Sequence, residues 1–311
     1  MKRLLLAAIA ALIALILGVG ATLAGPSDDV RAALLRGDHA SALRMLLPIA
    51  QSGNAQAQED LGEMFWFGRG TMRDHAEAVK WLSLSAAQGM AKSQILMGDA
   101  HAFGQGVLRD YSEAVKWYRQ AAEQGAVLGQ FRLGSMYANG RGVPQVYAEA
   151  LKWYRLAAQS PNVGGTKAQI ELGAMYAAGR GVPRDYVEAL RWFRLAAENG
   201  DVDALQRVGS IHANGLGVPQ DHVEALKWYR LAAERGHTLA QIGVGSAYLS
   251  GKGVRTDHVR GYMWVDLAAA AGDAEAEKIR ERLVKTLTPT QLAAAKRLAQ
   301  ECQERKFKGC D

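Results

Sequence analysis

The sequence predicts an all-α protein, a right-handed α/α superhelical solenoid of about six helix-hairpin repeats with capping helices. Tryptophan recurs in steps of 36, 36, 39, 36 and 36 residues, at Trp81, Trp117, Trp153, Trp192, Trp228 and Trp264. A glycine series that begins at Gly62 and a Gly-x-Gly series that begins at Gly68 keep the same steps. Because three residue series agree over six copies, the repeat decides the fold class.

Composition places the chain among ordinary folded proteins. It has 311 residues, of which 49% are hydrophobic and 22% charged, and this balance excludes wholesale disorder. Only two cysteines occur, which excludes disulfide-dense miniproteins and cysteine-rich zinc modules. The formal charge of +6 is mild and the charges are interspersed, so we expect no nucleic-acid partner.

The first 24 residues are predicted to be a signal peptide. Lys2 and Arg3 precede an apolar run from Leu4 to Val19, and small residues follow through Ala24. The alternative is an uncleaved membrane anchor, because the run from Leu4 to Ala24 is just long enough to span a bilayer. Both interpretations export the rest of the chain, and the only membrane contact we expect is this possible anchor.

Three parts follow the signal peptide. Residues 25–52 are interpreted as an N-terminal capping hairpin, residues 53–272 as the six repeats, and residues 273–311 as C-terminal capping helices. The step of 39 residues places a three-residue insertion between the third and fourth repeats. The segment 160–167 that contains it is interpreted either as a hinge or as a harmless insertion.

The first helix of each repeat, helix A, is an amphipathic helix that glycine terminates. In the fourth repeat Ala168, Leu172 and Met175 stand at i, i+4 and i+7, which makes one apolar stripe. Gly173 is expected where a neighbouring helix packs too close for a side chain. Gly179 ends the helix, because the position after a helix favours positive φ.

The second helix, helix B, opens with an Asp-x-x-Glu pattern, as at Asp185 and Glu188. The Asp side chain is expected to accept the free N–H groups of the first turn, and the Glu to bond back to the Asp N–H. Ala189, Trp192 and Ala196 then form the predicted buried stripe. A single hairpin cannot bury both apolar faces, so neighbouring repeats must stack.

The C-terminal part contains a helix start and a pair of cysteines. Thr288 and Pro289 are predicted to open a final amphipathic helix. Cys302 and Cys310 lie close together in the tail CQERKFKGC, and in an oxidising compartment we expect them to form a disulfide.

The fourth repeat carries the pattern A-x-x-x-L-G-x-M-Y-x-x-G-x-G-V-x-x-D-x-x-x-A-x-x-W-x-x-x-A-A-x-x-G. Over residues 53–272 the chain resembles the Sel-one-like repeat (SLR) family, whose members are related to tetratricopeptide repeats. The resemblance implies an adaptor that holds other proteins, and exported bacterial members include regulators of sensor kinases and envelope assembly factors. One secreted branch with a cysteine pair in each repeat binds or hydrolyses penicillins, whereas no repeat here contains cysteine.

No residue pattern indicates catalysis. His75 and His101 stand where other repeats have Tyr111 and Tyr137, so we interpret these histidines as packing residues. No H-E-x-x-H, G-x-S-x-G or phosphate-loop pattern occurs. We therefore predict no catalytic residue, no metal site and no cofactor, and a protein that is not an enzyme.

In an α-solenoid a partner usually binds the concave face, which helix A lines. One stripe of helix A changes freely among the six copies, so the fold does not require it. We predict that this stripe lines a binding groove, and its candidate residues are Asp60, Glu63, Phe67, Asp99, Phe103, Arg132, Asn139, Glu171, Arg207 and Asn214. The groove would be acidic and aromatic at its N-terminal end, which suits a partner with a basic, apolar segment. The alternative is that these positions are simply solvated.

The combined prediction is an exported bacterial adaptor or regulator, periplasmic or secreted, that binds a partner protein. A sensor kinase or an envelope assembly component would be such a partner. Two alternatives stay open: a cell-wall-active or β-lactam-hydrolysing enzyme, and a scaffold of an envelope secretion or export assembly.

Overall fold

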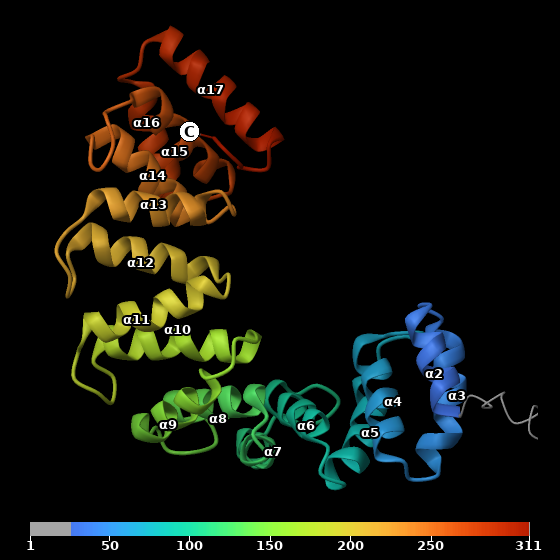
Figure 1. Cartoon of the computed structure of the whole chain (residues 1–311). Helices are drawn as coiled ribbons and strands as arrows, with labels where there is room; N and C mark the ends of the chain where they lie inside the picture. The colour runs from blue at the N-terminus through green and yellow to red at the C-terminus, as the bar shows by residue number, and fades with distance from the viewer. Residues whose placement is uncertain (1–25, 311) are drawn as a thin grey trace, which may run out of the picture. The chain divides into compact units, whose positions relative to one another are not determined.

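The computed structural model describes residues 26–310, with side chains from Asp29 onward, and confirms the predicted all-α solenoid. Helices follow one another without a strand in this part of the chain, as Figure 1 shows. The predicted signal peptide lies outside the described residues. Among the residues that the structure describes, no helix is both long and apolar enough to cross a membrane.

The chain divides between Ala121 and Ala122 into two compact units. Unit 1 holds, in chain order, α2 (Pro26–Leu35), α3 (His39–Gln51), α4 (Ala55–Phe67), α5 (His75–Ala87), α6 (Ala91–Phe103) and most of α7 (Tyr111–Glu123). Its apolar core forms in steps between successive helices rather than as one central cluster.

Unit 2 begins near the end of α7 and continues the same pattern. Its helices are α8 (Val127–Asn139), α9 (Tyr147–Ala157), α10 (Val163–Ala178), α11 (Tyr186–Glu198), α12 (Val202–Asn214), α13 (His222–Ala233), α14 (Thr238–Ser250), α15 (His258–Ala270), α16 (Ala274–Val284) and α17 (Pro289–Glu304). Each helix packs mainly on the next one in the sequence, which is the arrangement of a repeat protein.

Helices begin at aspartate caps and end at glycine as predicted, with one correction. Asp185 accepts hydrogen bonds from the N–H groups of Val187 and Glu188, and Gly179 ends α10 at φ 70°. The glutamate of the Asp-x-x-Glu pattern, however, bonds forward along the helix: Glu77 accepts from Lys80 Nζ at 2.6 Å and from Trp81 Nε1 at 3.1 Å. A reciprocal capping box forms instead at the start of α17.

The buried aromatic column of helix B lies one residue beyond the predicted one. Trp192 is only partly buried, whereas its neighbour Phe193 is 2% exposed. A Cβ atom on Gly173 would lie 2.6 Å from the Phe193 ring, so the glycine leaves room for this residue. Gly62 and Leu82 have the same relation in the first repeat. The prediction that a neighbouring helix packs on this glycine is confirmed. Of the predicted tryptophan column only Trp264 is fully buried, whereas Trp81, Trp117, Trp192 and Trp228 are partly buried and pack against the edges of the apolar clusters.

The three-residue insertion does not form a loop. It lengthens the start of α10, which runs for 16 residues where the other A helices of the repeats run for 13. Asn162 caps this helix through the N–H of Gly165, and Gly164 packs on Val127 and Leu128 of α8. Segment 160–167 is therefore largely helical.

The C-terminal helices cover the last repeat. Met263, Trp264 and Leu267 of α15 are buried, and α16 and α17 both pack on this helix. Cys302 and Cys310 form a disulfide whose two residues are buried in the same apolar cluster.

Candidate functional site

Five of the ten candidate residues lie in unit 1, on consecutive A helices. Asp60, Glu63 and Phe67 belong to α4, and Asp99 and Phe103 belong to α6. We call these five residues the acidic–aromatic cluster. Glu63 and Asp99, and likewise Phe67 and Phe103, stand at equivalent positions of the two helices, because the repeat carries one helical register from α4 to α6.

Two carboxylates of the cluster are engaged within unit 1. Glu63 is 8% exposed and forms an ion pair with Lys92 of the next A helix. Asp99 accepts a hydrogen bond from the Tyr118 hydroxyl at 2.6 Å. The first contact joins neighbouring repeats and the second joins the two helices of one repeat, so both carboxylates have a structural role that the sequence pattern does not reveal.

Asp60 is the carboxylate most available to a partner. It is partly buried and accepts a hydrogen bond from Gln56 Nε2 at 2.8 Å. Burial raises the pKa of Asp60, and the charge of Glu59 adds to this rise, whereas Gln56 and Lys92 lower it. A cation from outside would therefore stabilise a carboxylate that the protein itself solvates poorly.

A hollow of about 710 Å³ lies beside Asp60, between α2, α3 and α4. Its apolar walls are Val30, Leu34, Leu46 and Ile49. Asp60, Gln56 and Arg31 supply polar groups around these walls. The arrangement can hold an apolar side chain next to a charged one.

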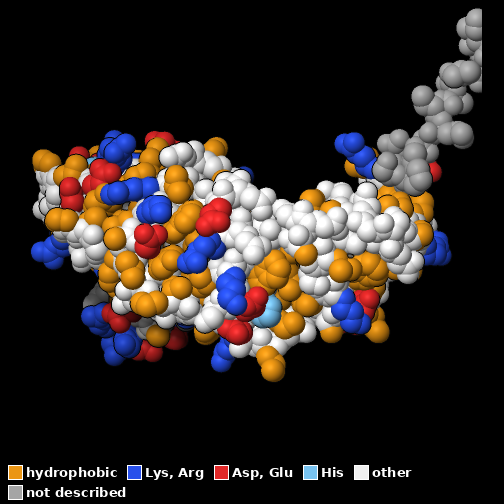
Figure 2. All heavy atoms as spheres, turned by 90° about the horizontal axis from the view of Figure 1, so that it is seen from below, with side chains coloured by type: hydrophobic (Ala, Val, Ile, Leu, Met, Phe, Trp, Pro, Cys, Tyr) orange, Lys and Arg blue, Asp and Glu red, His pale blue; other side chains and the backbone are white. Residues whose placement is uncertain are grey.

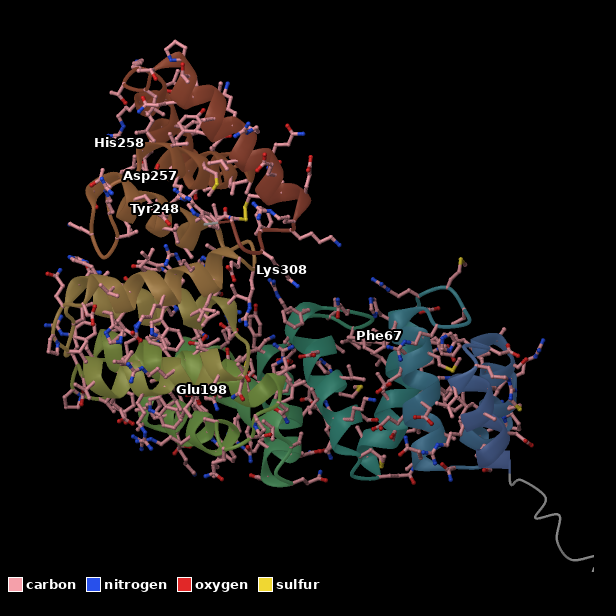
Figure 3. All side chains as sticks on the ribbon, turned by 45° about the horizontal axis from the view of Figure 1, so that its top comes forward. Phe67, Glu198, Tyr248, Asp257, His258 and Lys308 are labelled. Atoms are coloured by element: carbon pink, nitrogen blue, oxygen red, sulfur yellow. A yellow bond between two sulfur atoms is a disulfide. The ribbon has the colours of Figure 1, made fainter. Side chains whose placement is uncertain are left out.

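The two phenylalanines of the cluster are exposed. Phe67 is 45% exposed at the C-terminal end of α4, where Figure 3 labels it, and Phe103 is 59% exposed at the same position of the next repeat. The Arg69 guanidinium lies 5.0 Å from the centre of the Phe67 ring. Two consecutive repeats thus leave an aromatic ring exposed at equivalent positions.

Glu59 is a polar residue that the sequence analysis missed. It is 5% exposed, and its Oε2 accepts from the Ser93 backbone N at 3.1 Å and from Ser93 Oγ at 2.9 Å. Met90, the N-cap of α6, makes no side-chain cap. Glu59 therefore caps α6 from a neighbouring helix. Other repeats have an apolar residue or glutamine at this position, and that departure is the signal that could have indicated it.

The other five candidate residues lie in unit 2. Asn139 and Asn214 each donate to a serine carbonyl of their own helix, at 2.8 Å. The Arg207 guanidinium lies 5.5 Å from the Phe193 ring centre. Partial burial raises the pKa of Glu171, and the charges of Arg207 and Arg180 oppose this rise. Arg132 is half-buried on α8.

Two histidines contact a neighbouring helix, which belongs to the same repeat for His75 and to the preceding repeat for His212. The His75 ring meets Trp66 edge-on, with ring centres 4.7 Å apart. His212 Nε2 lies 3.0 Å from Arg194 Nη2, so the guanidinium donates to an unprotonated ring nitrogen. Burial and the charge of Arg194 lower the pKa of His212. Among the described residues no group of three His, Cys, Asp or Glu side chains is placed to hold a metal ion.

Tyrosines at the position of His212 accept the same kind of hydrogen bond. Arg155 donates to the Tyr176 hydroxyl at 2.7 Å, and Arg230 donates to the Tyr248 hydroxyl at 2.8 Å. Figure 3 labels Tyr248 on α14. At three successive junctions of unit 2, an arginine of helix B thus bonds to helix A of the next repeat.

On the face that Figure 2 shows, basic, acidic and apolar side chains are mixed, without a broad area of one charge.

Comparisons with known proteins agree with this architecture. The family model of the Sel1 repeat matches six successive segments, which are residues 55–90, 91–125, 127–162, 166–201, 202–237 and 238–273. A crystal structure of a Sel1 repeat protein from Oxalobacter formigenes is 32% identical and covers 82% of this chain and 76% of its own, with a TM-score of 0.70. No curated protein matches the chain.

Two further structures are more distant. A putative Sel1 repeat protein from Klebsiella pneumoniae subsp. pneumoniae is 24% identical over 63% of this chain and 94% of its own, with a TM-score of 0.43. An immunity protein from Pseudomonas aeruginosa is 19% identical over 70% of this chain and 81% of its own, with a TM-score of 0.42.

Proposed function

The chain belongs to the Sel1 repeat family, and on that basis we propose that it is an exported adaptor that binds a partner protein through the acidic–aromatic cluster of unit 1. Sel1 repeats generally mediate interactions between proteins. The observation that carries the proposal is the exposure of Phe67 and Phe103, 45% and 59%, at equivalent positions of two consecutive repeats.

The partner segment combines apolar side chains with a basic one. Apolar side chains cover Phe67 and Phe103 and enter the hollow beside Asp60. The basic side chain pairs with Asp60, whose pKa burial raises above its ordinary value. Such a pair forms in a partly desolvated place, where it contributes more to specificity than a fully exposed ion pair does.

Export rests on the sequence pattern of residues 1–24, with its basic start, apolar centre and small residues before the expected cleavage site. Fractionation of the host bacterium, followed by N-terminal sequencing of the chain, tests it. We expect the chain in the periplasmic or secreted fraction without its first two dozen residues. An intact chain in the cytoplasmic fraction contradicts the proposal.

Crosslinking capture with the tagged full chain in the host envelope fraction tests the binding surface. Asp60→Lys and the double variant Phe67→Ser/Phe103→Ser should each lose the partner while the helical circular dichroism and melting temperature stay unchanged. Glu63 is left intact in this design, because its ion pair with Lys92 holds two repeats together.

The matched control is Leu239→Ser, which removes a 56%-exposed apolar side chain from an A helix of unit 2. This variant should capture the partner as the unaltered chain does. Retained capture by the phenylalanine double variant overturns the assignment of the surface.

A further inference from the structure

Long side chains of unit 2 cover the rings that follow Trp153 and Trp192. Arg207 of α12 lies over Phe193 of the preceding repeat, with 5.5 Å between the guanidinium carbon and the ring centre. Glu171 occupies the same position one repeat earlier, and its charge acts on Tyr154 of the preceding repeat. The two rings are each 2% exposed. The repeat thus buries this ring between the glycine of its own helix A and a long side chain of the next.

The last repeat lacks that covering side chain. Gly243 stands at the position of Arg207, and a Cβ atom there would lie 3.1 Å from the Tyr229 ring. Without a side chain at this position Tyr229 is only partly buried. A hollow of about 410 Å³ opens over the ring, between α12, α13 and α14.

The junction between the third and fourth repeats shows what the hollow lacks. There Tyr154 of the third repeat comes together with Glu171 and Arg180 of the fourth: the charge of Glu171 contributes to the raised pKa of Tyr154, and the charges of Arg207 and Arg180 favour ionised Glu171. At the junction between the fifth and sixth repeats, Tyr229 and Lys252 occupy the positions of Tyr154 and Arg180. Only the glutamate has no counterpart, because Gly243 replaces it.

We propose that the hollow over Tyr229 binds an acidic side chain of a partner peptide, with its methylene groups on the Tyr229 ring and its carboxylate directed to Lys252. The partner supplies the group that Glu171 of the fourth repeat supplies to Tyr154 of the third. This glutamate pocket, defined by Tyr229, Gly243 and Lys252, lies in unit 2 and is separate from the acidic–aromatic cluster.

The lining of the glutamate pocket fits this occupant. Lys252 and His222 are its ionisable basic residues, and none of the described residues that line it is acidic. Ser246 and Ser250 keep the wall beside Gly243 small, which leaves the ring face open. A guanidinium or ammonium group would meet Lys252 without a counter-charge, so charge complementarity selects the carboxylate.

Titration of the isotope-labelled full chain with short peptides, followed by NMR, tests the pocket. The probes are Ser-Leu-Glu-Leu-Ser and its counterparts with Gln or Lys in the central place. We expect the Glu peptide to shift the amide signals of Gly243, Ser246 and Lys252. Its Kd should be about fivefold lower than that of the Gln peptide, the upper range for one solvated ion pair.

Two variants make the test specific. Lys252→Glu should reverse the order, so that the Lys peptide binds better than the Glu peptide. Gly243→Glu should fill the pocket and abolish the shifts, and Leu239→Glu is its matched control, because it adds the same charge to α14 outside the lining residues. The control should keep the affinity within about twofold.

Equal binding of the Glu and Gln peptides, or an unchanged preference in Lys252→Glu, overturns the proposal. Circular dichroism shows whether the Gly243→Glu variant still folds. The result for Lys252→Glu tests the proposal independently of the Gly243→Glu variant. Asp60→Lys should leave the peptide shifts unchanged, so a failure of the glutamate pocket and a failure of the proposed adaptor function are distinguishable.

Discussion

At the residue scale, the separation of helices A and B within a repeat depends on one glycine and one larger side chain. Gly173 faces Phe193, Gly134 faces Tyr154, and a Cβ atom on either glycine would lie less than 3.0 Å from the facing ring. The tryptophan beside each ring instead lies at the edge of the hairpin, where its indole N–H can bond to a glutamate one turn earlier, as at Trp228.

Gly173→Ala should therefore lower the free energy of unfolding by about 1–3 kcal/mol, because the added methyl group overpacks a filled contact. Urea denaturation measures the change. In a double-mutant cycle with Phe193→Ala the two effects should not add, since removal of the ring removes the clash. Strict additivity would show that Gly173 is needed for another reason.

His212 predicts a pH dependence of stability. Its pKa is lowered in the folded state by burial and by Arg194, from the ordinary value of 6.5. The unfolded chain therefore binds the extra proton more readily, so this contribution to stability is present above about pH 6.5 and is lost as the pH falls through the window below it.

His212→Tyr should reduce this acid sensitivity while it keeps the hydrogen bond, because tyrosines accept from Arg155 and Arg230 at the equivalent positions. Melting temperatures of both proteins between about pH 5 and pH 7.5 make the comparison. His258→Tyr, at an exposed helix start, controls for the loss of a titratable group. If acid lowers the melting temperature of His212→Tyr as much as that of the unaltered chain, His212 is not the group responsible.

At the element scale, contacts between repeats complete the ends of helices. Glu59 caps α6 from a helix of the preceding repeat, where α4 and α12 use their own N-cap residues Asn54 and Asp201. Buried glutamines act at the opposite ends: Gln94 Nε2 donates to the Ala86 carbonyl at 3.2 Å. Helix ends that lack a local partner are thus satisfied by a neighbouring hairpin.

Glu59→Ala should lower the free energy of unfolding by about 1–3 kcal/mol, because Ser93 N–H and the start of α6 lose a buried acceptor. Met90→Asp in the same chain should recover part of the loss by capping α6 locally. Chemical denaturation of the single and double variants measures both effects. Gln56→Ala, on the same turn of α4 but exposed, should change stability by less than about 0.5 kcal/mol.

At the scale of the whole molecule, stability comes from nearest neighbours along the chain. Each apolar cluster joins a few successive helices, and the terminal helices α16 and α17 cover the last repeat of unit 2. A defect at one end of such a unit should therefore weaken the adjacent repeat first.

Truncation after Gly272 removes α16 and α17 and uncovers Met263, Trp264 and Leu267 of α15. Hydrogen exchange followed by mass spectrometry should show faster exchange in α14 and α15 and little change in α8 and α9. Cys302→Ser/Cys310→Ser is the milder control, which should lower stability by at most about 2–3 kcal/mol at this end. A uniform increase of the exchange rate over all helices of unit 2 contradicts nearest-neighbour stability.

The repeat, the helix boundaries and the caps could be predicted from the sequence, because each depends on residues within one turn or one hairpin. Asp185 caps its own helix and Gly179 ends α10 in a left-handed conformation, and both effects are local. Six copies of the same local signals then predict the solenoid, since identical hairpins with two apolar faces must stack.

Only the tertiary structure decided which of the predicted groove residues are available. Glu63 pairs with Lys92 from the next repeat, and Asp99 receives the Tyr118 hydroxyl from a different helix. The open ring of Tyr229 likewise depends on Gly243, which belongs to another repeat. A local pattern predicts its own helix, whereas the burial and the partner of each side chain depend on atoms that only the packing of one hairpin on the next brings together.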